Sequence, residues 1–140
     1  MAKTSRELFD ELSYYTLAQP RPPFVHQIAI DTFTAQHADA ATKPMAVVFA
    51  LVGLYLHNEK GFSGLQVQKV HMQLAAKRKQ WPVLPAPQER GAIGVADVLR
   101  AAPGAERDAL IEGWCASVWQ AWRSSGAVIA SLLKDELDIG

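Results

Sequence analysis

The stretch MAVVFALVGLYL, residues 45–56, contains twelve apolar or small residues and no charge. A membrane-spanning helix needs roughly twenty such residues, so this run is too short for one. A helix that is apolar on nearly every side is typical of a position that is buried all round. We therefore expect residues 45–56 to belong to the central helix of a helical bundle, with Phe49 and Leu54 buried.

Capping signals divide residues 22–80 into three helices joined by short turns. Proline is favoured in the first turn of a helix, and Pro23 and Pro44 stand at the start of two of them. Serine and threonine are favoured N-caps, which gives Thr42 and Ser63 that position. We expect the three helices over residues 23–38, 43–57 and 64–80.

The rest of the chain continues the helical pattern. Thr4 and Glu7 form a capping box at the start of a helix over residues 5–17. Residues 81–94 contain three prolines and should form a loop, and loops of that length are uncommon without a packing or functional role. A short helix is expected over residues 95–101. A long last helix follows over residues 105–122 and either ends there or continues to Leu133.

These elements predict an all-α protein in a single domain, residues 1–140. We expect a compact helical bundle of four to five main helices plus a short helix, with no significant sheet.

The 14 Lys and Arg residues equal the 14 Asp and Glu residues, so the formal net charge is zero. Proteins that bind nucleic acid usually carry a basic excess, so we expect no nucleic acid as a partner. The polar first residues lack the apolar core of a signal peptide. We therefore expect a cytoplasmic protein that has no membrane contact. A neutral protein also repels its own copies weakly, which favours self-association.

His26 and His37 share one face of the helix expected over residues 23–38. At about 1.5 Å of rise per residue they lie roughly 16 Å apart, too far to bind one metal ion. If consecutive helices alternate in direction, His71 comes level with Asp31. A metal or small-ligand site could then combine His26 and His71 with a carboxylate such as Asp31 or Glu59. The alternative is that each histidine is a hydrogen-bonded packing residue, and the absence of a His-Glu-x-x-His motif favours it.

The last expected helix carries Cys115 and three tryptophans, at positions 114, 119 and 122. A lone cysteine forms no intramolecular disulfide, and in an apolar helix it is expected to be inert. The tryptophans are either core or a partner surface, because aromatic residues are enriched at interfaces. The apolar run over residues 128–133 favours the partner surface. We therefore expect a homodimer in which residues 119–133 lose solvent exposure.

Several segments resemble a family of small bacterial proteins of unknown function. They are ELSYYTL (11–17), FVHQ (24–27), AQH (35–37), GLYL (53–56), GFSG (61–64), WP (81–82), VADV (95–98) and WCASVW (114–119). The resemblance covers most of the chain and implies a bacterial source and a compact helical domain, but it brings no activity. Five residues match the family's motif positions and become the ligand-binding candidates: His26, Gln27, Asp31, His37 and His71.

Two functions remain open at this point. The first is a ligand-binding or interaction protein that acts as a homo-oligomer, with a small molecule as a possible ligand. The alternative is a metal-dependent enzyme that holds a divalent metal at His26 and His71 in the bundle interior. Elemental analysis of the purified protein distinguishes the two.

Overall fold

The computed structural model describes residues 2–77 and 80–140, and no strand occurs among them. The predicted all-α class is confirmed. The helices are α1 (Ser5–Leu17), α2 (Pro22–Gln36), α3 (Pro44–Lys60), α4 (Gly64–Lys77), α5 (Val95–Arg100), α6 (Ala105–Ala121) and α7 (Gly126–Leu137), with a 3-10 turn η1 (Arg123–Ser125) before the last.

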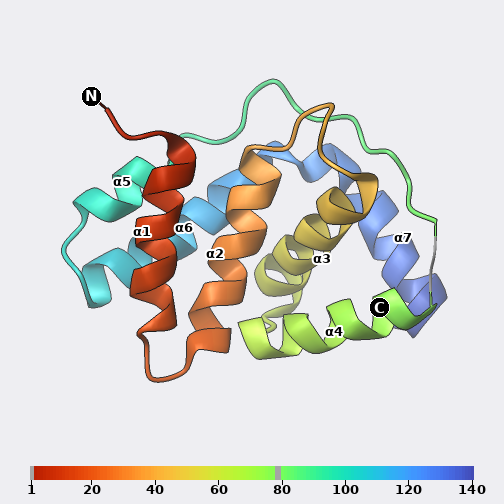
Figure 1. Ribbon diagram of the computed structural model, residues 1–140. Coiled ribbons are helices and arrows are strands. Elements are labelled where there is room, and N and C mark those ends of the chain that lie inside the picture. The colour runs from red at the N-terminus through yellow and green to blue at the C-terminus, as the bar shows by residue number, and fades with distance from the viewer. Residues whose placement is uncertain (1, 78–79) are drawn as a thin grey trace.

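The helices α1, α2 and α3 stand side by side, α4 lies across the lower end of α2 and α3, and α6 and α7 pack behind them (Figure 1). Helix α2 contacts α1, α3, α4 and α6, and α3 contacts α2, α4, α6 and α7. The centre of the bundle is therefore shared between α2 and α3. No helix in the described part of the chain is both long enough and apolar enough to cross a membrane.

Helix α3 is buried along its length, as its apolar sequence predicts. Leu54 is almost fully buried, whereas Phe49 is only partly buried, against our expectation. The reason is local, since the Phe49 ring stacks between side chains of α4 and of the following loop instead of pointing into the core. Gly61 adopts a left-handed conformation, with φ of 71°, and ends α3 after Lys60.

Of the two N-caps predicted at Ser63 and Thr42, the first is confirmed and the second is wrong. The Ser63 hydroxyl accepts the amide N–H of Gln66 at the start of α4, as a capping residue does. Thr42 is not the N-cap of α3, because that position belongs to Lys43. The Thr42 hydroxyl instead accepts the amide N–H of Asp39 and closes the turn between α2 and α3. The expected end of α4 falls partly on residues 78–79, which lie outside the described residues.

The last helix does not continue to Leu133, because the chain turns sharply after α6. The amide N–H of Trp122 donates to Val118 O and Trp119 O, and the amide of Ser125 donates to Trp122 O. These bonds tighten the chain into η1, and α7 then begins as a separate helix. Trp119, Trp122 and Leu133 are thereby buried within the chain itself.

Each tryptophan of this region donates its indole N–H to a neighbouring helix. Trp114 donates to Oε1 of Gln36 at 2.9 Å, Trp119 to Oε2 of Glu59 at 2.9 Å, and Trp122 to the backbone oxygen of Ala35 at 3.0 Å. The tryptophans are therefore core residues with satisfied donors. The surface argument for a homodimer through residues 119–133 does not hold.

Candidate functional site

The buried carboxyl group of Asp31 is the most unusual polar group in the bundle. Asp31 lies on α2 and is 3% exposed. Its Oδ1 accepts a hydrogen bond from Nε2 of Gln27 at 3.0 Å, one helical turn earlier. Its Oδ2 has no hydrogen-bond partner among the described residues. A buried carboxyl oxygen without a partner is costly, which makes this position a candidate for function.

Space for this carboxyl group comes from Gly53 on α3. A Cβ atom at position 53 would lie 1.8 Å from Oδ2 of Asp31. Helix α3 thus reaches Asp31 only because residue 53 has no side chain. A glycine inside a helix weakens it by roughly 1 kcal/mol relative to alanine, so its place here has a packing reason.

His71 on α4 completes the centre from the other side. Its Nε2 lies 3.9 Å from Oδ2 of Asp31 and donates a hydrogen bond to the backbone oxygen of Phe49 at 2.8 Å. Burial raises the pKa of the Asp31 carboxyl well above its usual range. Burial lowers the pKa of the His71 imidazole, and the bond to Phe49 opposes this only in part. Both side chains therefore favour their neutral forms.

A stack of rings connects this centre to the loop after α4. The Phe49 ring stacks on the His71 imidazole, with 4.9 Å between ring centroids. The Trp81 ring meets Phe49 edge-on at 5.1 Å. Trp81 thus contacts Phe49, which in turn stacks on the histidine beside Asp31.

The five candidates from the sequence divide into one cluster and two separate residues. Gln27, Asp31 and His71 come together. His71 and Asp31 lie next to each other, as we expected. His26 instead bonds through Nδ1 to the Thr16 hydroxyl of α1 at 2.8 Å, and burial lowers its pKa. His37 is solvent-exposed at the end of α2, with its ring against that of Phe33.

The carboxylates and histidines do not gather around a common point. Glu59, the other carboxylate that we expected near the site, accepts the indole N–H of Trp119. Within residues 2–77 and 80–140, no group of three or more His, Cys, Asp or Glu side chains is arranged to hold a metal ion. His26 and His71 therefore do not form the predicted shared metal centre with a third such ligand.

The loop after α4 crosses the top of the bundle from α4 to α5 (Figure 1). We call residues 81–90 the strap. Trp81 fixes its beginning, as described above. Arg90 fixes its end by donating from Nη1 to the backbone oxygens of Gln36 at 2.9 Å and Ala35 at 3.3 Å. Its guanidinium group also lies over the Trp122 ring, 5.7 Å from the centroid.

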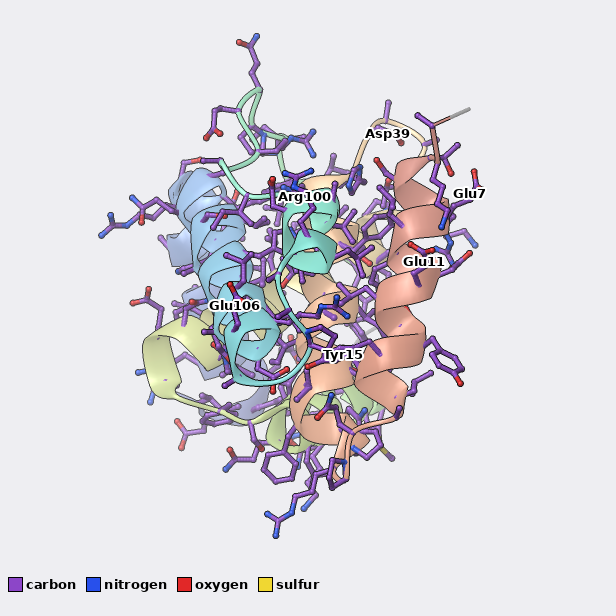
Figure 2. The ribbon with its side chains drawn as sticks, turned by 90° about the vertical axis from the view of Figure 1, so that its left-hand side faces the viewer. Glu7, Glu11, Tyr15, Asp39, Arg100 and Glu106 are labelled. Carbon is purple, nitrogen blue, oxygen red and sulfur yellow. The ribbon has the colours of Figure 1, made fainter. Side chains whose placement is uncertain are left out.

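Beneath the strap lies a cavity of about 400 Å³. Strap residues form one wall, the link between α2 and α3 forms another, and α3 and the end of α6 complete it. The lining residues are Ala38, Asp39, Ala40, Thr42, Pro44, Val47, Val83, Leu84, Ala86 and Trp122. Asp39 stands on the link at the upper end of the molecule (Figure 2). Most of the lining is apolar, so the cavity suits an apolar ligand.

Sequence reasoning missed Gly53, Arg90 and this cavity. Gly53 had a signal, because a glycine within an otherwise bulky apolar helix indicates a close approach. Arg90 had almost none, since one arginine in a proline-rich loop is ordinary on a surface. The cavity depends on two segments far apart in the chain, which no local pattern encodes.

Comparison with known proteins gives a family and nothing more specific. The model of DUF5946, a family of unknown function, matches residues 3–123. No curated protein and no solved structure matches the chain.

Proposed function

We propose that this chain, which belongs to DUF5946, a family of unknown function, binds a small apolar molecule in the cavity beneath the strap. The observation that carries this proposal is the cavity itself, of about 400 Å³. Small-molecule sites in proteins are clefts or cavities of about 300–1,000 Å³ with mostly apolar walls. A space of this size holds a small molecule and is too small for a partner's helix.

The lining favours an apolar ligand body with at most one polar end. Ala38 and Val47 supply aliphatic walls. The Trp122 indole N–H is already bonded to Ala35 O, so this side chain contributes apolar ring surface. The polar groups of the lining are Asp39 and Thr42, and their side chains hold the turn between α2 and α3.

The strap supports the proposal because it is held at both ends and exposed in between. Proline fixes φ near −65°, so Pro82, Pro85 and Pro87 stiffen the segment. Val83, between the anchors, is 81% exposed although it lines the cavity. A stiff roof reduces the ordering cost of binding. The centre at Asp31 and His71 then supports the roof from below through Phe49, without touching the ligand.

Filling the cavity tests the proposal directly. Val47→Phe adds a ring to the wall, and Val128→Phe makes the same change on α7, where Val128 is 43% exposed. The probe is the neutral dye N-phenyl-1-naphthylamine, with the indole N–H resonance of Trp122 as a local reporter. We expect the dye to bind the native chain and the Val128→Phe variant and to shift the Trp122 resonance. Val47→Phe should weaken binding at least about tenfold.

Two results would contradict the proposal. One is equal dye binding by the Val47→Phe variant and the native chain, which would place the dye elsewhere. The other is the absence of dye binding and of any Trp122 shift over a panel of neutral aromatic and aliphatic compounds. Circular dichroism of both variants checks that the helices are retained.

A metal-dependent enzyme is the second candidate, and the unpartnered Oδ2 of Asp31 is the observation that favours it. Oδ2 of Asp31 and Nε2 of His71 lie 3.9 Å apart, and Nε2 would bind a metal only after giving up its hydrogen bond to Phe49 O. Elemental analysis of tag-free protein tests this function. Near-stoichiometric zinc, iron or manganese that is lost in Asp31→Asn would support it, and substoichiometric metal in the native chain would rule it out.

Self-association is a separate proposal that now rests on the neutral charge alone. The apolar side chains that first suggested it are largely buried within the chain. Sedimentation equilibrium at micromolar concentration measures the mass in solution. A mass of one chain across the concentration range would exclude the homodimer.

A further inference from the structure

One cationic and one titratable side chain lie together at the end of α2, and none of the ion pairs among the described residues includes either of them. They are His37, which follows α2, and Arg90 at the end of the strap. Both line a cavity of about 350 Å³, separate from the one beneath the strap, together with the Ser5 side chain at the start of α1. A guanidinium group without a carboxylate partner, beside an imidazole that can take up a proton, is a setting that can bind an anion.

The guanidinium group of Arg90 is held in place by backbone oxygens. Nη1 donates to Gln36 O and Ala35 O, and Nε donates to Pro87 O. None of these acceptors is a carboxylate, and the C-terminal end of α2, which supplies Ala35 O and Gln36 O, offsets only part of the Arg90 charge. Nη2 has no hydrogen-bond partner among the described residues, which leaves two N–H groups of this nitrogen for a ligand.

His37 offers a second donor beside this group. Its ring packs on Phe33, with 4.4 Å between centroids, and neither ring nitrogen has a hydrogen-bond partner among the described residues. Burial and the nearby charge of Arg90 lower the pKa of the His37 imidazole. An anion between the two groups would offset this repulsion and favour a protonated His37.

Three carboxylates near Arg90 or His37 in the sequence keep their negative charge but accept hydrogen bonds from other groups. Asp97 on α5 accepts the amide N–H of Gly94 and pairs with Arg100. Glu89, beside Arg90 on the strap, accepts the amide N–H of Gly91. Asp39, past the end of α2, accepts the amide N–H of Ala41.

We propose that Arg90 and His37, in a cavity that Ser5 also lines, bind a phosphate group. Phosphate fits because arginine and phosphate form strong charge-assisted hydrogen bonds, with oxygens to spare for the imidazole. The cavity has room for a small phosphate ester as well as for the free ion. This site shares no lining residue with the apolar cavity, but Arg90 also anchors the strap, so His37→Gln is the variant that separates the two proposals.

Nuclear magnetic resonance of the full chain tests the site with inorganic phosphate as the probe. The pKa of each histidine is followed at matched ionic strength in chloride, acetate and phosphate. We expect phosphate to raise the pKa of His37 saturably, to leave those of His26 and His71 unchanged, and to act at lower concentration than acetate. Arg90→Gln should weaken phosphate binding at least about tenfold, whereas Arg100→Gln, a matched change on exposed α5, should not.

His37→Gln keeps the test decisive if loss of Arg90 disturbs the strap, because His37 is exposed. In that variant the side-chain Nε–H resonance of Arg90 reports binding, and phosphate should bind several-fold more weakly than to the native chain. The proposal is overturned if the pKa of His37 is the same in phosphate and chloride. It is also overturned if acetate binds more tightly than phosphate, or if Arg100→Gln weakens binding as much as Arg90→Gln.

Discussion

Asp31 and His71 are close neighbours that do not bond to each other. Nε2 of His71 lies 3.9 Å from Oδ2 of Asp31 but gives its proton to the backbone oxygen of Phe49, at 2.8 Å. The one side-chain bond of the carboxyl group comes from Gln27, at the other oxygen. Because burial favours the neutral form of both groups, the pair is not a salt bridge that stabilises the fold.

The first prediction concerns the pH dependence that Asp31 imposes. Its folded pKa is raised above the unfolded value of about 3.9, so the unfolded chain ionises first as pH rises. The contribution of the neutral carboxyl to the free energy of unfolding is fully present below the pKa of the unfolded chain. It is lost as pH rises through the pKa of Asp31 in the folded chain. Asp31→Asn does not titrate, so it should gain stability relative to the native chain over this window, by up to about 1.4 kcal/mol per pH unit.

Urea unfolding of both chains between pH 4 and about pH 8 measures this difference. Asp10→Asn is the control, because Asp10 is an exposed carboxylate on α1 and should give a nearly constant difference. A difference for Asp31→Asn that stays flat over the same range would show that Asp31 titrates normally in the fold.

The second prediction concerns Gly53→Ala. The new Cβ would lie 1.8 Å from Oδ2 of Asp31 and 2.7 Å from its Cγ, so one of the two helices must move. We expect a loss of about 1–3 kcal/mol in the free energy of unfolding, despite the better helix propensity of alanine. In an Asp31→Ala background most of this loss should disappear, which a double-mutant cycle measures.

Gly113→Ala on α6 is the matched control. Its added Cβ would meet only Ile93 Cδ1, at an ordinary 3.5 Å, so this change should be neutral or stabilising by up to about 1 kcal/mol. Additive costs of Gly53→Ala and Asp31→Ala would mean that the two residues are not in contact.

The helices were predictable because their signals are local. The Thr4–Glu7 capping box, the prolines at the starts of α2 and α3, and the apolar run of α3 all act within a few residues. The prediction placed Asp31 and His71 level with each other by assuming that α2, α3 and α4 alternate in direction. The two residues are neighbours, but α4 lies across the lower end of α2 and α3 and does not run parallel to α2 (Figure 1).

The partners of the side chains were not predictable, because they join distant parts of the chain. Trp114 and Gln36 are bonded across 78 positions, and Arg90 reaches Gln36 across 54. An apolar helix with three tryptophans fits a core or an interface equally well until those partners are known. Phe49 shows the same limit, since its ring contacts that of Trp81, 32 positions later in the chain.

The third prediction concerns the reactivity of Cys115. The thiol is fully buried, and burial raises its pKa to about 12. Asn58 donates a hydrogen bond to its sulfur at 3.4 Å, which opposes that rise only in part. Since the thiolate is the reactive form, native Cys115 should react with a disulfide reagent at pH 8 on the order of a thousandfold more slowly than the unfolded chain.

The measurement is the release of thionitrobenzoate with and without guanidinium. The residual native rate should follow the opening of the fold and rise in variants that unfold more readily, such as Gly53→Ala. A native rate close to the unfolded one would mean that Cys115 is accessible in the folded chain.

The last prediction concerns His57, whose two ring nitrogens both face acceptors. Nδ1 donates to Phe62 O at 2.7 Å, and Nε2 donates to Oε2 of Glu112 on α6 at 2.6 Å. The bond to Glu112 raises the pKa of the imidazole, because the protonated ring can satisfy both acceptors. A raised folded pKa stabilises the fold fully below the unfolded value of about 6.5, and this contribution is lost as pH rises through the folded value.

Glu112→Gln should lower the pKa of His57 toward its usual value, which resonance titration of the imidazole measures. The loss of stability should be largest below about pH 6.5 and should shrink at higher pH. The Glu112 side chain is 58% exposed, so solvent screening limits the loss to about 1 kcal/mol or less. Glu106→Gln, in the first turn of α6 (Figure 2), should leave the pKa of His57 unchanged. An unchanged pKa of His57 in Glu112→Gln would show that the contact with Glu112 does not set the proton affinity of this histidine.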